Sequence, residues 1–102
     1  MLDTKLQGWK LLWLELWKDK ARFQELSYVR YLDNGSETVI VFIRQETPAS
    51  VACVSAERTS YDASYRQYRR VEDVMSEAEV GELIRLFKAL SGAAEDVTVQ
   101  LL

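Results

Sequence analysis

Apolar residues in the first 20 positions recur at the spacing of an amphipathic helix. Thr4 and Gln7 match a capping box, in which the Thr hydroxyl and the Gln side chain satisfy two backbone amides at a helix start. We therefore expect a helix from about Thr4 to Lys20, although the interior Gly8 costs it about 1 kcal/mol relative to alanine. One wide face of this helix would carry the following apolar residues: Leu2, Leu6, Trp9, Leu12, Trp13, Leu16 and Trp17.

Two leucines do not fit that face. Leu11 and Leu14 project onto the side that carries Gln7. Either they form a second apolar strip that contacts a partner or a second copy, or a loop or the C-terminal tail covers them. Trp17 lies near the edge of the main face, and a partly exposed tryptophan is a typical interface anchor.

The middle of the chain predicts a β-hairpin. Residues 23–32 and 37–46 are rich in strand-forming side chains, and Asn34-Gly35 between them tolerates the positive φ values of a type I′ turn. The run Val39–Ile43 is apolar without alternation, which favours a central strand covered on both faces. A two-residue loop would give the cross-strand pairs Leu32–Glu37, Arg30–Val39, Tyr28–Val41, Leu26–Ile43 and Glu25–Arg44. A three-residue loop with a Gly bulge would shift the pairing by one residue and move side chains to the other face.

The second half of the chain predicts a further strand and a helix. Val51 to Arg58 alternates as a strand, whereas the periodicity of residues 59–71 does not distinguish a strand from a loop. Ser76 and Glu79 form a second capping box before a helix that ends at Gly92. Residues 96–102 are consistent with a short strand or an apolar tail.

These elements predict one α+β domain over residues 1–102. Its order would be α-β-β-β-(β)-α-(β), an antiparallel sheet of three to five strands with the N-terminal and C-terminal helices packed on it.

Composition excludes several classes of chemistry. The 102 residues include one cysteine and no histidine, so the usual general base and the usual zinc nitrogen ligand are absent. We find no motif for catalysis, for a metal or for a cofactor, and we expect a protein that is not an enzyme. No apolar stretch approaches the roughly 20 residues of a membrane span, and no signal peptide precedes the first helix, so we expect a cytoplasmic protein.

Charge is unevenly distributed along the chain. Residues 58–70 alternate tyrosines with arginines, a combination that stacks on unpaired bases and pairs with phosphate. The alternative is a solvated edge strand whose charged side chains deter pairing, and the net charge of −3 favours it. The candidate contact residues in this segment are Tyr65, Arg66, Tyr68, Arg69 and Arg70.

In layout, a helix, three strands and a second helix resemble the double-stranded-RNA-binding domain. The second helix of that family opens with a basic cluster, whereas Ser76-Glu77-Ala78-Glu79 is acidic, so the family's function is not carried over. Size, charge and element order are similar to those of anti-CRISPR proteins, which inhibit bacterial immune nucleases. That resemblance implies a small inhibitor from a phage or mobile element.

Our leading functional hypothesis is a non-enzymatic protein-interaction module that contacts a protein partner or itself. The expected contacts are Leu11, Leu14 and Trp17 together with the tyrosine and arginine side chains of residues 65–70. The alternative is a nucleic-acid-binding domain that uses residues 58–70.

Overall fold

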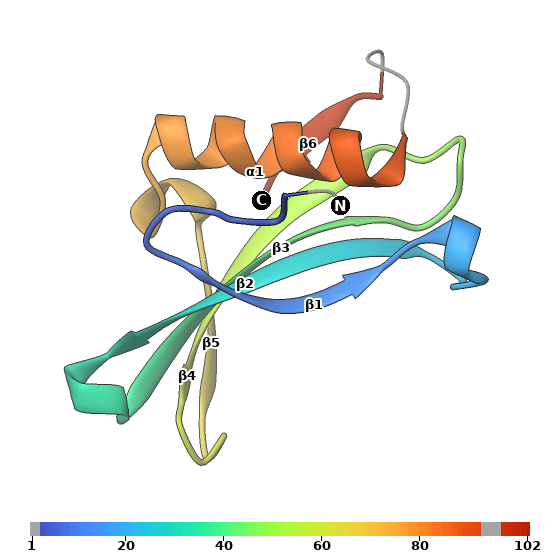
Figure 1. Ribbon diagram of the computed structural model, residues 1–102. Coiled ribbons are helices and arrows are strands. Elements are labelled where there is room, and N and C mark those ends of the chain that lie inside the picture. The colour runs from blue at the N-terminus through green and yellow to red at the C-terminus, as the bar shows by residue number, and fades with distance from the viewer. Residues whose placement is uncertain (1–2, 93–96) are drawn as a thin grey trace.

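A six-stranded sheet forms the framework of the protein, and one face of it carries an α-helix (Figure 1). The computed structural model describes residues 3–92 and 97–102. Its strands are β1 (Lys10–Glu15), β2 (Gln24–Leu32), β3 (Glu37–Gln45), β4 (Ala52–Ser60), β5 (Arg66–Arg69) and β6 (Val99–Leu101). Its helices are α1 (Glu77–Ser91) and the short 3-10 helices η1 (Trp17–Asp19), η2 (Asp33–Gly35) and η3 (Val71–Asp73).

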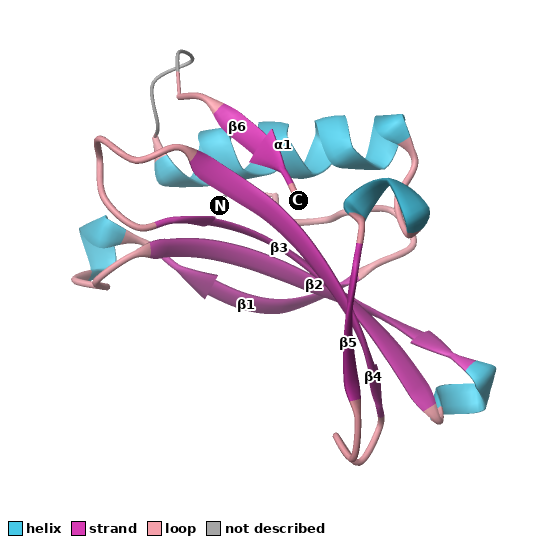
Figure 2. Ribbon diagram, turned by 180° about the vertical axis from the view of Figure 1, so that it is seen from behind, coloured by secondary structure: helices cyan, strands magenta, loops and turns pink. Residues whose placement is uncertain are grey.

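The strands follow the order β1-β2-β3-β4-β5, and each neighbouring pair is antiparallel. β6 pairs in parallel with residues 52–54 of β4, so the sheet is mixed (Figure 2). The predicted antiparallel sheet of three to five strands with two helices is therefore wrong. Residues 59–71 and 97–102, which periodicity did not resolve, contain the C-terminal end of β4, all of β5 and all of β6; Asp96 lies outside the described residues.

The predicted helix from Thr4 to Lys20 is wrong, because this segment forms a turn at residues 7–8, then β1, and then the short 3-10 helix η1. Gly8 has a φ of +84°, which no right-handed helix accommodates, and the Trp9 amide donates to the Leu6 carbonyl at 3.0 Å in a turn. A β-bulge between Leu11 and Trp13 then shifts the alternation of β1. The bulge allows consecutive apolar residues to serve both faces of the sheet, and this produces a spacing that resembles a helix.

Gly8 provides a test of this N-terminal turn. A Cβ atom at this position would lie 3.1 Å from Arg30 Nη2 in addition to the unfavourable φ. We expect Gly8→Ala to lower the free energy of unfolding by about 1–2 kcal/mol in chemical denaturation. Gly81→Ala is the control, because a Cβ there meets nothing within 4 Å and alanine favours the helix. Equal stability of Gly8→Ala and the wild type would contradict the strained turn.

The predicted hairpin register is confirmed. β2 and β3 pair Leu32 with Glu37 and Tyr28 with Val41, as expected from the Asn34-Gly35 turn. Asn34 and Gly35 have φ values of 56° and 92°, and the Ser36 amide donates to the Asp33 carbonyl at 3.2 Å. The turn thus fixes which side chains of both strands face α1.

The predicted C-terminal helix is also confirmed. The Glu79 amide donates to Ser76 Oγ at 3.1 Å, the Ser76 amide donates to Glu79 Oε1 at 2.9 Å, and Gly92 ends α1 in the left-handed conformation. One face of α1 is buried against the sheet, and its buried residues are Val80, Leu83, Leu86, Phe87 and Leu90. Within residues 3–92 and 97–102, no helix has the length and apolar character needed to cross a membrane.

α1 covers only one face of the sheet (Figures 1 and 2). Val39, Val41 and Ile43 point toward it and are buried, whereas Ile40 and Phe42 point to the other face and are partly exposed. The prediction that the Val39–Ile43 strand is covered on both faces is therefore wrong. We call this uncovered surface the helix-free face.

Candidate interaction surfaces on the two faces of the sheet

A groove of about 390 Å³ crosses the helix-free face. Its floor is formed by side chains of β2 and β3, and β1 and β4–β5 form its two sides. Because these strands are hydrogen-bonded to one another, the groove is a feature of a fixed backbone. The lining residues are Leu12, Trp13, Glu25, Ser27, Ile40, Phe42, Arg44, Glu57 and Arg66.

The apolar part of the groove lies toward β1. Leu12 is 47% exposed and Trp13 is 53% exposed, and both line the groove because the bulge in β1 places consecutive side chains on one face. Trp13 Nε1 donates to Glu15 Oε1 at 2.7 Å, which restrains the indole ring. Ile40 and Phe42 extend the apolar surface across β3. Large exposed apolar side chains gathered in a concavity are typical of an interaction site.

The polar part of the groove carries both signs of charge. Arg44 lies 3.7 Å from Glu25, and Arg66 lies 3.4 Å from Glu57. The Arg44 guanidinium also stacks on the Phe23 ring, with 3.6 Å to its centroid. Burial raises the pKa of Glu25, and the nearby Arg44 only partly offsets that rise. The groove therefore has an apolar side and a rim of paired charges.

A second concavity, of about 440 Å³, lies on the helix-covered face beyond the N-terminal end of α1. Here the β2–β3 and β4–β5 hairpins extend past the helix and diverge (Figure 1). Arg30, Arg58 and Arg69 come from three different strands and line it together with Trp9. We call it the arginine cup.

The charges of the arginine cup are largely matched within the chain. Arg30 lies over the Trp9 ring, 4.2 Å from its centroid, and its Nη2 donates to Glu79 Oε2 at 2.9 Å. Burial opposes ionisation of Glu79, but hydrogen bonds from Ser76 and Trp9 and the charge of Arg30 outweigh it and lower the pKa of Glu79. These contacts join the N-terminal segment, β2 and the start of α1.

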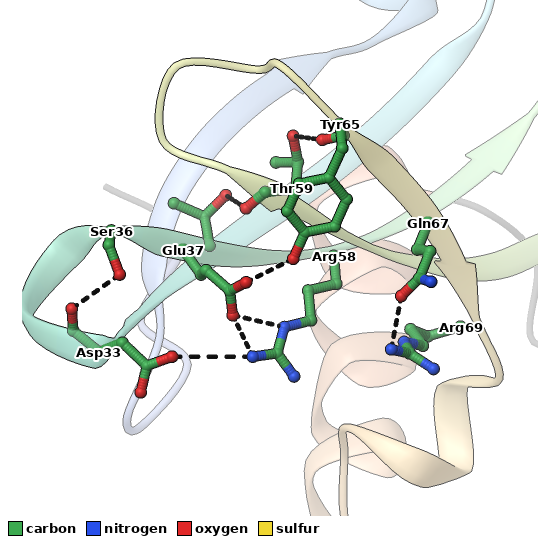
Figure 3. Close-up of polar contacts among 9 residues, drawn as sticks. Asp33, Ser36, Glu37, Arg58, Thr59, Tyr65, Gln67 and Arg69 are labelled. Carbon is green, nitrogen blue, oxygen red and sulfur yellow. Dashed lines mark hydrogen bonds and ion pairs between the residues drawn. The ribbon is translucent and has the colours of Figure 1, made fainter.

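The second ionic cluster of the cup joins the two hairpins (Figure 3). Arg58 donates to Glu37, and the Tyr65 hydroxyl donates to the same carboxylate. The hydrogen bond from Tyr65, followed by that from Arg58, lowers the pKa of Glu37. Arg69 contacts Gln67 and, within the described residues, forms no ion pair. The cluster therefore connects β3 to the β4–β5 hairpin through side-chain hydrogen bonds.

The alternation of β5 separates the tyrosines and arginines that the sequence placed together. Arg66 and Tyr68 point to the helix-free face, whereas Gln67 and Arg69 point to the arginine cup. Tyr65 precedes β5 and bonds to Glu37 at the cup. Arg70 follows β5 and pairs with Glu72. Residues 65–70 therefore form no continuous surface.

The remaining predicted contact residues lie elsewhere. Leu11 and Leu14 point to the helix-covered side of β1 but remain 40% and 36% exposed, because they lie at the edge of the sheet. Trp17 is half-buried in η1, and its Nε1 donates to the Arg22 carbonyl at 3.4 Å. No single surface contains all the predicted residues.

The apolar part of the groove was not predicted from the sequence. The apolar spacing placed Leu12 and Trp13 in a helix core, and the apolar run of residues 39–43 placed Ile40 and Phe42 in a strand covered on both faces. The signals that pointed to a strand were Gly8, which disfavours a helix, and the two leucines that fell off the helical face. Without a strand at residues 10–15, the groove lacks the side that Leu12 and Trp13 form.

No protein-family model, no curated protein and no solved structure matches the chain. The layouts that resembled the double-stranded-RNA-binding domain and the anti-CRISPR proteins both required a helix at residues 4–20. Since that segment contains a turn, β1 and the three-residue η1 instead of an α-helix, neither resemblance is retained.

Proposed function

We propose that the protein is a non-enzymatic interaction module that binds an apolar segment of a protein partner in the groove of the helix-free face. The observation that carries the proposal is the apolar side of this groove, where Leu12, Trp13 and Phe42 are presented by hydrogen-bonded strands. Exposed tryptophan within an apolar patch and a polar rim is the usual composition of a protein-binding site. The non-enzymatic part rests on the sequence, which contains no histidine.

The distribution of charge supports a protein rather than a nucleic acid as the partner. Three of the four arginines in residues 58–70 are paired with carboxylates: Arg58 with Glu37, Arg66 with Glu57, and Arg70 with Glu72. A nucleic-acid surface presents unpaired positive charge to phosphates. The net charge of −3 adds long-range repulsion of a polyanion.

We expect Trp13→Asp to remove this binding. Peptides are selected against the wild-type protein from a displayed random library, and their affinities are measured by isothermal titration calorimetry. A carboxylate in the groove would be desolvated without a partner, so the affinity of the selected peptides should fall about tenfold or more. Tyr61→Asp is the control, because Tyr61 is an aromatic residue that is even more exposed than Trp13 and lies in the β4–β5 turn, outside the groove.

Two outcomes contradict the groove as a peptide site. One is a selection that yields no binding peptide, and the other is a set of peptides that bind Trp13→Asp as tightly as the wild type. The nucleic-acid alternative has its own signature. A mobility shift with single-stranded oligonucleotides that weakens with salt, and that Arg66→Glu abolishes, would favour that alternative.

A further inference from the structure

The outer edge of β1 is an exposed and apolar edge of the sheet. β1 ends the strand order, and no described strand pairs with its outer side (Figure 1). Four consecutive apolar residues, Leu11 to Leu14, are each at least 36% exposed along this edge. The opposite edge strand, β5, has only four residues and carries arginines at both ends. An exposed apolar edge strand invites pairing with another strand, and natural proteins normally block it with charges.

The bulge gives β1 a symmetric pattern of faces. Lys10 and Glu15 pair with Val29 and Glu25, so both point to the helix-free face, whereas Leu11 and Leu14 pair with Tyr28 and Leu26 and point to the other face. Leu12 and Trp13 between them both line the groove of the helix-free face. The order of faces along β1 is therefore the same in both directions: helix-free, helix-covered, helix-free, helix-free, helix-covered, helix-free. A strand of six residues without a bulge cannot do this, because its first and last residues point to opposite faces.

From this symmetry we infer that β1 pairs antiparallel with β1 of a second copy of this chain, about a two-fold axis between Leu12 and Trp13. In this register Leu11 lies opposite the second copy's Leu14, and Leu12 lies opposite its Trp13. Every cross-strand pair then shares one face, as antiparallel pairing requires. Shifting the register by one residue in either direction places side chains from opposite faces against each other.

The backbone supports the same register. Lys10 and Glu15 both pair with odd-numbered residues of β2, and Leu11 and Leu14 both pair with even-numbered ones. In an antiparallel ladder the amide and carbonyl groups of alternate residues point to the same neighbouring strand. The outward-pointing groups of β1 are therefore arranged symmetrically about the bulge, and the two arms of the strand can both hydrogen-bond to a symmetry-related copy.

Charge completes the match. The register places Lys10 opposite Glu15 of the second copy, and the two-fold axis repeats this pair at the other end. Within the described chain neither side chain forms an ion pair, and Glu15 lies opposite the like-charged Glu25 of β2. A second copy therefore supplies Lys10 and Glu15 with the oppositely charged partners that they lack within the described chain.

The inference is tested by reversing charges at the two ends of β1. Two strands of six residues bury little area, so we expect a dimer whose fraction rises with protein concentration in sedimentation velocity. Lys10→Glu or Glu15→Lys alone turns both attractive end pairs into repulsive ones and should weaken dimerisation about tenfold. The double variant Lys10→Glu/Glu15→Lys should restore it. An equimolar mixture of the two single variants should form a heterodimer, because opposite charges then meet at both ends.

The matched control is Lys18→Glu, which makes the same charge change in η1, outside β1. Lys18→Glu should dimerise as the wild type does. Mixing it with Lys10→Glu should not raise the fraction of dimer above that of the two proteins measured separately. A wild-type protein that stays monomeric at all concentrations would overturn the inference. So would single variants that dimerise normally, or a mixture that does not associate. Lys10 and Glu15 do not line the groove, so these outcomes do not decide whether the groove binds peptides. The Trp13→Asp experiment tests that proposal separately.

Discussion

Replacing Phe87 with alanine should lower the free energy of unfolding by about 3–5 kcal/mol. Phe87 is 1% exposed and lies on the face of α1 that packs on β2, β3 and β4. Truncation removes the transfer free energy of the ring and leaves a cavity between helix and sheet. For a domain of this size, such a loss takes a large share of the total stability. Chemical denaturation followed by tryptophan fluorescence measures it.

Two further variants make this result interpretable. Phe87→Leu keeps most of the buried volume and should cost less than half as much as Phe87→Ala. Ala89→Gln lies on the exposed side of α1 and should change stability by no more than about 0.5 kcal/mol. A loss below about 1 kcal/mol for Phe87→Ala would mean that α1 does not pack on the sheet as described.

Glu79→Ala should lower the free energy of unfolding by about 2–3 kcal/mol at neutral pH. One carboxylate accepts hydrogen bonds from the Ser76 amide, from Trp9 Nε1 and from Arg30 Nη2. Its removal takes away one of the two hydrogen bonds of the capping box. It also leaves Trp9 Nε1 and Arg30 Nη2 without this acceptor. Glu77→Ala is the control, because Glu77 lies in the same helical turn and is exposed, and among the described residues it has no hydrogen-bonded or ionic partner, so that the helix dipole is its main stabilising interaction.

The same carboxylate makes stability depend on pH. The pKa of Glu79 is lower in the folded protein than its ordinary value of 4.5. Above that value the carboxylate is ionised in both states, and its contacts stabilise the folded state in full. As the pH falls below 4.5 the unfolded chain takes up the proton first, so the stabilisation is lost. We expect the stability difference between the wild type and Glu79→Gln to shrink as the pH falls from about 5 to about 3. A constant difference would show that the charge of Glu79 contributes nothing.

Local signals allowed some elements to be predicted from the sequence. The Asn34-Gly35 turn predicts the register of β2 and β3 because only a few turns join strands so closely. The Ser76–Glu79 capping box and Gly92 predict both ends of α1 for a similar reason. In each case the residues that determine the structure lie within a few positions of it.

The elements that were missed depend on neighbours distant in the sequence. Residues 10–15 form a strand because β2 offers a partner edge, and the bulge conceals the alternation that would reveal it. The exposure of Ile40 and Phe42 depends on where α1 lies, which the apolar run of β3 does not encode. The predicted surface of tyrosines and arginines was wrong for a similar reason. Tyr65 to Arg70 are adjacent in sequence, but pleating sends them to opposite sides of the sheet.

β4 shares one of its edges between two partners. Residues 52–54 pair with β6, and residues 56–59 pair with β5, while β3 runs along the whole opposite edge. Mechanically, this edge consists of two seams in line, and the Val71 amide, just after β5, joins them by donating to the Leu102 carbonyl, just after β6, at 3.1 Å. A force that separates β5 from β4 therefore also reaches the end of β6 through this hydrogen bond. The short C-terminal strand thus acts as a clasp that transmits strain on the β4–β5 hairpin to the part of β4 that packs in the core.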